Sequence, residues 1–234
     1  MTDILITGAS RGLGLGLAEH FLERGERVHH LGRRPCPLTS ERLRQQSVDL
    51  ADLDAIPAAL DALDPPRPDL AILNAGVLGR IQDLAETAMD EARSVMDINL
   101  WANKAIVDWL IRKRRSPKQL VLISSGASVN GNRGWGAYSI SKAALNMMAK
   151  LYASEMPDSH VVAYAPGLVH TAMQDYLCHE VDSERFPSIR HLQNAYGSEH
   201  MPDPRRAARL IADSFATCLQ QPSGSFVDIR QLAT

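Results

Sequence analysis

Tyr138 and Lys142 stand four residues apart in a stretch with helical character. Side chains at this spacing emerge on one face of a helix, so a phenol and an ammonium can share a site. Lowering the pKa of a phenol by ~3 units from its usual value of about 10 requires ~4 kcal/mol of preferential phenolate stabilisation, and a nearby ammonium can supply much of this. Tyr138 is therefore a candidate general acid tuned by Lys142. The same spacing is also common on amphipathic helices that have no chemical role.

A glycine-rich turn near the N-terminus reads Thr7-Gly8-Ala9-Ser10-Arg11-Gly12-Leu13-Gly14. It follows a short apolar run over residues 3–7 and precedes a helical pattern. Glycines at such a junction let the backbone turn tightly and approach a pyrophosphate, while the amides and dipole of the helix attract the anion. The residues predicted to bind a dinucleotide here are Gly8, Ser10, Arg11, Gly12, Leu13 and Gly14.

Gly32-Arg33-Arg34 stands at the end of the second predicted strand, where many NAD-binding folds place an acidic residue on the ribose hydroxyls. Arg33 and Arg34, together with Arg11, offer planar donors suited to a 2′-phosphate, which a carboxylate would repel. The sequence therefore predicts NADPH/NADP+ as the cofactor. A solvated pair of arginines is the competing interpretation.

These residues need a fold that brings strand ends together. Strands are expected at residues 3–7, 27–31, 46–48, 70–73, 120–123, 161–165 and 226–229, and helices near 52–63, 86–111, 136–155 and 204–220. Alternating strands and helices predict an α/β fold with a single Rossmann-type doubly wound parallel sheet covered by helices on both faces. We expect one domain over residues 1–234, because this length is ordinary for one α/β domain.

Composition narrows the functional classes. The formal charge of −2 gives no general electrostatic reason to expect nucleic acid or an anionic membrane as a partner. No apolar run approaches the ~18 residues that span a bilayer, so we expect a cytoplasmic protein. The cysteines Cys36, Cys178 and Cys218 are far apart and are expected to be reduced thiols. The histidines lack the spacing of a zinc motif, and we predict no metal site.

Taken in order, these motifs and several others resemble the short-chain dehydrogenase/reductase family, in its compact single-domain branch, over nearly the whole chain. The further motifs are Asp49-Leu50, Asn74-Ala75-Gly76, Asn99 in Ile98-Asn99-Leu100, Ile123-Ser124-Ser125, and Pro166-Gly167-Leu168-Val169-His170-Thr171. The resemblance implies hydride-transfer chemistry on a small-molecule carbonyl substrate and a homodimer or homotetramer. The C-terminal sequence Ile229-Arg230-Gln231-Leu232-Ala233-Thr234 departs from the family's glycine-rich end, so the resemblance does not extend to oligomer contacts made through that terminus.

The resemblance also assigns roles. It implies that Ser125 orients the carbonyl, that Tyr138 donates the proton, that Lys142 lowers the tyrosine pKa and binds the ribose, and that Asn99 holds a water in a proton relay. On the cofactor, Asp49 and Leu50 are implied to border adenine. Further cofactor contacts are implied for Asn74, Ala75, Gly76, Pro166, Gly167, Val169 and Thr171.

The runs Arg133-Gly134-Trp135-Gly136-Ala137-Tyr138 and Gly224-Ser225-Phe226-Val227-Asp228 resemble the branch that contains sepiapterin and benzil reductases. That resemblance implies substrate contacts for Trp135 and Asp228 beside Ser125 and Tyr138. Trp135 can instead be a packing residue, and Asp228 a strand-end or surface carboxylate. Residues 172–203 are the least regular part of the sequence, and we expect them to form a substrate lid. A mobile surface insertion is the alternative.

Carbonyl reduction by NADPH is thus the first hypothesis. An NAD-dependent alcohol dehydrogenase and a dinucleotide-sensing protein without catalysis are the competitors, since a fold does not by itself imply an activity. The enzymatic interpretation requires Tyr138 and Ser125 to lie on the same side of the folded domain. If they stood on opposite sides of the domain, the enzymatic interpretation would fail.

Overall fold

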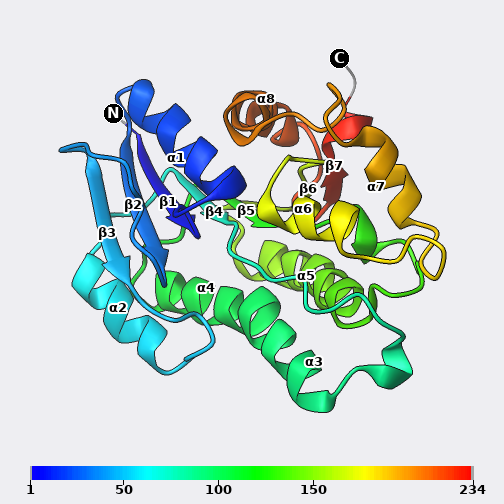
Figure 1. Cartoon of the computed structure of the whole chain (residues 1–234). Helices are drawn as coiled ribbons and strands as arrows, with labels where there is room; N and C mark the ends of the chain where they lie inside the picture. Colours follow the sequence, from blue (N-terminus) through cyan, green and yellow to red (C-terminus); the bar gives the residue numbers. More distant parts are fainter. Residues whose placement is uncertain (1, 233–234) are drawn as a thin grey trace.

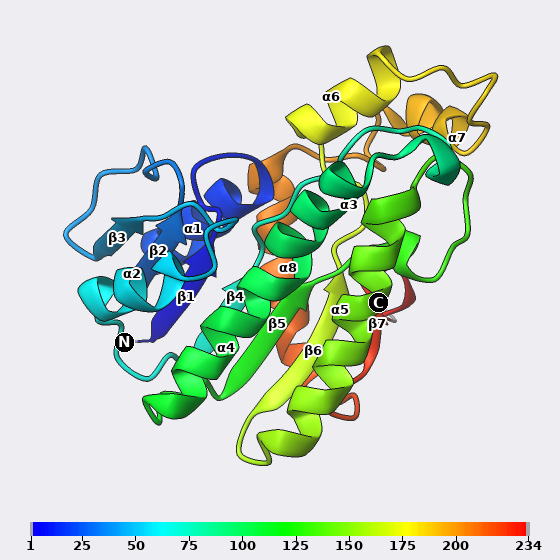
Figure 2. The same ribbon diagram turned by 90° about the horizontal axis from the view of Figure 1, so that it is seen from below.

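The computed structural model describes residues 2–232 and contains one parallel seven-stranded sheet in the order β3-β2-β1-β4-β5-β6-β7. The strands are β1 Asp3–Thr7, β2 Arg27–Gly32, β3 Leu43–Ser47, β4 Leu70–Leu73, β5 Gln119–Ile123, β6 His160–Ala165 and β7 Phe226–Asp228. The helices are α1 Gly12–Glu23, α2 Ala55–Leu63, α3 Met89–Met96, α4 Ala102–Arg112, α5 Gly136–Glu155, α6 Ala172–His179, α7 Ile189–Ala195 and α8 Pro204–Cys218. Helices lie on both faces of the sheet (Figures 1 and 2), which confirms the predicted doubly wound fold.

Each face of the sheet has its own apolar core, because successive strand side chains point to opposite faces. In β1, Leu5 packs with α2, α4 and α5, whereas Ile4 and Ile6 pack with α1 and α8. The inner strands are buried throughout, as expected for parallel strands covered on both faces. The carboxyl ends of the strands meet at one edge, where connecting loops can form a site.

Two predicted elements differ from those observed. β3 lies at Leu43–Ser47 rather than 46–48, because it is an edge strand whose polar, largely exposed residues lack an apolar alternation. The single helix predicted over 86–111 is divided into α3 and α4 by a π-helical turn at Asp97–Trp101. Hydrophobic periodicity does not reveal such a turn.

Residues 172–203 are more regular than predicted. They include α6 and α7, whose apolar side chains pack on Leu78, Ile81 and Tyr138 in a third core. This segment lies across the carboxyl ends of the strands, above α3 and α5 (Figure 2). Among the helices of residues 2–232, none combines the length and apolarity needed to cross a membrane.

Candidate active site

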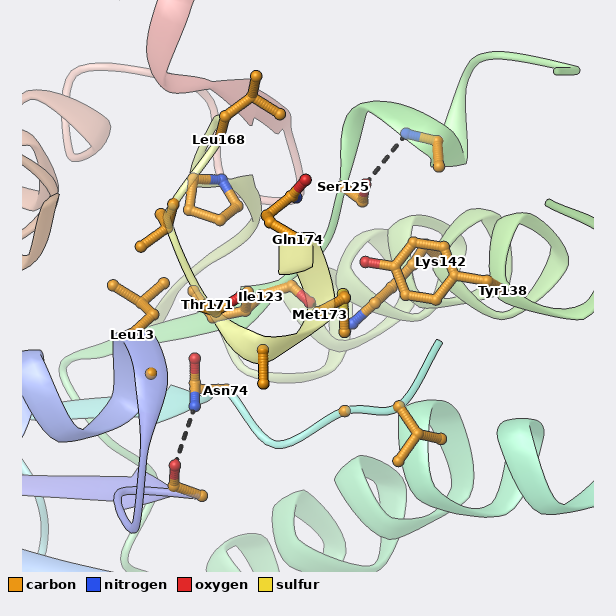
Figure 3. A pocket seen from close by; sticks show the side chains of 18 of the residues that line it. Leu13, Asn74, Ile123, Ser125, Tyr138, Lys142, Leu168, Thr171, Met173 and Gln174 are labelled. Atoms are coloured by element: carbon orange, nitrogen blue, oxygen red, sulfur yellow. Dashed lines mark hydrogen bonds between the residues drawn. The ribbon is translucent and has the colours of Figure 1, made fainter. Parts of the chain in front are cut away.

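A cavity of about 690 Å³ runs along the carboxyl ends of the strands, from the glycine-rich turn to the 172–203 segment. Figure 3 shows Leu13 and Asn74 at one end and Tyr138 and Lys142, from α5, at the other. Most of the predicted site residues line this cavity. Those that do not are Arg34, Asn99 and Asp228.

The glycine-rich turn is held in a tight form. Gly8 has a positive φ of 74°, and its amide donates to the Leu31 carbonyl oxygen at 3.0 Å. A Cβ on Gly14 would stand 2.3 Å from the Gly8 carbonyl oxygen and 2.5 Å from Asn74 Nδ2, so only glycine fits there. Among the residues that the structure describes, no side chain caps the N-terminus of α1. Its first amides are therefore available to an anion in the cavity.

His30, which is not among the predicted site residues, stabilises this turn through hydrogen bonds. It is buried, its Nδ1 accepts from the Ala9 amide at 3.2 Å, and its Nε2 lies 3.0 Å from the Arg34 carbonyl oxygen. Because Nδ1 accepts, Nε2 carries the proton and donates to Arg34. The imidazole therefore ties the glycine turn to the end of β2. A histidine inside a predicted strand gave no sequence signal for this role.

At the end near the glycine-rich turn, the exposed Arg11 and Arg33 line the cavity, whereas Arg34 does not. Arg33 Nη1 lies 3.8 Å from Asp49 Oδ2, so the two arginines share this end with one carboxylate. Asn74 Nδ2 donates to the Thr7 carbonyl oxygen at 3.1 Å and thereby joins the ends of β4 and β1. The predicted cofactor contacts Pro166, Gly167, Val169 and Thr171 also line the cavity.

Ser125, Tyr138 and Lys142 meet at the other end of the cavity. Ser125 follows β5 and accepts from the Ala127 amide at 3.1 Å. The Lys142 ammonium donates to the Ile123 carbonyl oxygen at 2.7 Å and lies 5.7 Å from the Tyr138 ring centroid. The phenol and the serine hydroxyl therefore share one side of the domain.

Burial controls the electrostatics of this group. It raises the pKa of Tyr138, and the hydrogen bond with Ser125 acts in the opposite direction. Burial also lowers the pKa of Lys142 to about 8. In both cases burial disfavours the charged form of the side chain, which is the phenolate of Tyr138 and the ammonium of Lys142. At neutral pH the phenol is thus protonated and able to give its proton, and most of the lysine is an ammonium.

Asn99 lies on the π-helical turn and is fully buried outside the cavity lining. Its Nδ2 donates to the Val77 carbonyl oxygen at 2.8 Å and to Ser141 Oγ at 3.0 Å, and its Oδ1 accepts from the Val77 amide at 2.8 Å. Both amide hydrogens are used, so the side chain fastens the loop after β4 to α5. A water molecule can therefore bind to Asn99 only by donating a hydrogen bond to the side-chain amide oxygen or the backbone carbonyl oxygen.

Trp135 connects the cavity to the 172–203 segment. Its ring lies 6.1 Å from that of Tyr138, and its Nε1 donates to Ser188 Oγ at 3.0 Å. His170 and Asp175 also line the cavity and form a polar cluster with Tyr196, whose hydroxyl donates to Asp175 Oδ1 at 2.6 Å. The segment thus meets the cavity through polar and aromatic groups.

The predicted substrate residue Asp228 lies behind the cavity wall. Its side chain is 6% exposed and pairs with Arg230, whose side chain is 57% exposed and lines the cavity. Arg230 is not among the residues predicted from the sequence to lie in the site. An arginine in a C-terminal segment that departs from the family pattern carries no local sign of facing a cavity.

Known proteins that resemble this chain point to one family. The model of the family described as short chain dehydrogenase matches residues 2–182. A benzil reductase ((S)-benzoin forming) of Bacillus subtilis is 31% identical over 245 residues, covering 97% of this chain and 98% of that protein. Sepiapterin reductase of Bos taurus is 32% identical over 205 residues, covering 74% of each. The structure of the short chain dehydrogenase/reductase YIR035C of Saccharomyces cerevisiae has a TM-score of 0.86 and 25% identity, covering 100% of this chain and 98% of that one.

The chain therefore belongs to the short-chain dehydrogenase/reductase family of oxidoreductases. Proteins of this family bind a nicotinamide dinucleotide and act on small molecules. The residues present fit such a cofactor, because free helix amides, a tight glycine turn and two arginines line one end of the cavity and the phenol lines the other.

Proposed function

We propose that this protein reduces a ketone or dicarbonyl substrate with NADPH, with Tyr138 as the general acid. The observation that carries the proposal is the meeting of Ser125, Tyr138 and Lys142 at the end of a cavity that begins at a dinucleotide-type glycine turn. The benzil reductases among the relatives support carbonyl reduction as the reaction. The bound dihydronicotinamide would supply the hydride.

The protein's own part is to hold the carbonyl and move a proton. The Ser125 hydroxyl donates to the carbonyl oxygen and stabilises the negative charge that develops there. Tyr138 gives its phenolic proton to that oxygen, which completes the alcohol. The ammonium of Lys142 stabilises the phenolate that remains, and solvent then reprotonates it.

The arginines support NADPH over NADH. Arg11 and Arg33 line the adenosine end and can donate to a 2′-phosphate. Asp49 lies 3.8 Å from Arg33 and is the feature that favours the NAD alternative. The two dissociation constants discriminate these cases: tighter NADPH binding supports the proposal, and tighter NADH binding supports an NAD-dependent enzyme.

We further propose that residues 172–203 form a substrate lid over a single cofactor-binding domain. The packing of α6 and α7 on Tyr138, and the hydrogen bond from Trp135 to Ser188, support this role. Trp135 would then form part of the substrate wall.

A substrate panel tests the proposed reaction. Benzil, further α-diketones and sepiapterin are each mixed with NADPH, and loss of its absorbance is followed together with the stereochemistry of the alcohol formed. Oxidation of NADPH by one or more of these carbonyls supports the proposal. Tight NADPH binding with no oxidation by any carbonyl would instead favour a sensor that has kept the fold without catalysis.

A further inference from the structure

Arg230 brings a cation to the substrate end of the cavity. It lies in the short 3₁₀ helix Ile229–Gln231 that follows β7. Its guanidinium stands beside Gly126, the residue after Ser125, because a Cβ on Gly126 would lie 3.2 Å from Arg230 Nη2. The other lysine and arginine side chains lining the cavity are Arg11 and Arg33 at the adenosine end and Lys142 beneath Tyr138. Arg230 is therefore suited to contact the substrate.

Asp228 fixes the direction of this guanidinium. Its Oδ1 accepts from the Arg230 backbone amide at 3.0 Å and from Nε at 2.9 Å, and its Oδ2 accepts from Nη2 at 2.5 Å. A fork held on one edge by a carboxylate keeps its remaining donors, two on Nη1 and one on Nη2, for another acceptor. The nearly buried Asp228 and the half-exposed Arg230 thus form a preset donor group.

Gly126 leaves the space that this group needs. Its φ lies outside the left-handed region, so the backbone does not require glycine there. A Cβ at this position would lie 3.2 Å from Arg230 Nη2, which is closer than an ordinary contact, and 3.9 Å from Asn130 Nδ2, which is an ordinary contact. Asn130 also lines the cavity. The turn that carries Ser125 is therefore shaped to admit the guanidinium.

From this arrangement we propose that Arg230 is a specificity-determining residue that binds a second oxygen of the substrate, near the carbonyl that Ser125 and Tyr138 engage. The chemical class is a 1,2-dicarbonyl or a 2-keto acid, since both present an acceptor oxygen beside the reacting carbonyl. Asp228 acts through Arg230 as a positioning residue and does not touch the substrate. This proposal rests on the proposed function and adds the substrate class.

The test compares substrates that carry an oxygen acceptor beside the reacting carbonyl with substrates that lack it. Values of kcat/KM are measured with benzil and with deoxybenzoin, which lacks one carbonyl oxygen, and with benzoylformate and acetophenone as the keto acid pair. The wild type is compared with Arg230→Met, Arg230→Lys and the double variant Arg230→Met with Asp228→Asn, which leaves no unpaired buried carboxylate. Arg93→Met is the matched control, because Arg93 is exposed on α3 and pairs with Asp90.

We expect Arg230→Met to lower kcat/KM for benzil or benzoylformate by about 10- to 100-fold, as for loss of a charged hydrogen bond, mainly through KM. The loss with deoxybenzoin or acetophenone should be much smaller, and Arg93→Met should not alter the ratios. A loss mainly with benzoylformate assigns a carboxylate to the site, and an equal loss with both assigns a shared oxygen acceptor. Arg230→Lys keeps the positive charge but lacks the planar guanidinium. A kcat/KM for the dicarbonyl or keto acid that is higher in Arg230→Lys than in Arg230→Met also supports the proposal.

Equal losses with dicarbonyl and monoketone, in both the single and the double variant, would overturn the role of Arg230 and leave carbonyl reduction intact. If the wild type reduced none of these carbonyls while binding NADPH, the proposed function and this inference would both be wrong. The wild-type arm therefore separates the two failures.

Discussion

The ammonium of Lys142 donates to the carbonyl oxygen of Ile123 at 2.7 Å, two residues before Ser125 in the chain. This bond fixes a helix side chain to the end of β5, and so sets the positions of α5 and the serine turn relative to one another. The Lys142 ammonium and the Ser125 hydroxyl are therefore positioned by the same strand end. The relative positions of Lys142 and Ser125 are thus set where α5 packs against the end of β5.

Lys142 should set an upper pH limit on the activity. Burial lowers its pKa to about 8, so the ammonium is present below that pH and is lost as pH rises through it. In the dinucleotide-free protein, NMR titration of the lysine side chains should show one Nζ that titrates near this value. If reduction needs the ammonium, kcat/KM should fall above pH about 8. A Lys142 that titrates near its ordinary value of 10.5 would contradict this prediction.

His30→Ala should loosen the glycine turn. The change removes the acceptor of the Ala9 amide and the donor to the Arg34 carbonyl, and leaves two backbone groups without partners. We expect a loss of about 1–3 kcal/mol in the free energy of unfolding, together with weaker NADPH binding. Thermal or urea unfolding and fluorescence titration measure the two effects. His200→Ala, at an exposed histidine, is the control, and equal effects in the two variants would refute the bracing role.

Gly14→Ala should abolish dinucleotide binding. The new Cβ would stand 2.3 Å from the Gly8 carbonyl oxygen, which forces the turn apart. The matched change Gly131→Ala adds a Cβ with no heavy atom within 4 Å and should leave binding unaltered. Isothermal titration of both variants with NADPH checks this. Wild-type affinity in Gly14→Ala would show that the turn does not shape the cofactor site.

Much of this site could be predicted because its signals are local. The spacing of Tyr138 and Lys142 and the order of glycines from Gly8 to Gly14 follow from helix geometry and turn chemistry, which neighbouring residues set. Arg230 and His30 could not be found this way. Their roles arise from contacts with Gly126 and Ala9, which folding brings together from distant parts of the chain. The bounds of the edge strand β3 could not be predicted either, because its exposed residues show no apolar alternation.

Trp135→Phe should distinguish the packing of the Trp135 ring beside Tyr138 from the hydrogen bond that links Trp135 to the 172–203 segment. Phenylalanine keeps an aromatic ring beside Tyr138 but loses the hydrogen bond from Nε1 to Ser188 Oγ. If residues 172–203 close over the substrate, KM should rise by about 3- to 10-fold, as for loss of one neutral hydrogen bond, with a smaller change in kcat. Ser188→Ala should give a similar rise, and the double variant should not add to it. Fully additive effects would mean that this bond does not anchor the segment.

The most direct test of the account is turnover by Tyr138→Phe with a carbonyl that the wild type reduces, measured beside its dissociation constant for NADPH. Removing only the phenolic oxygen leaves the glycine turn and Lys142 in place, so NADPH should bind within about threefold of wild type while turnover falls by about 10²- to 10⁴-fold. Wild-type turnover in this variant would mean that the proton comes from another group, and the account of the site would be wrong.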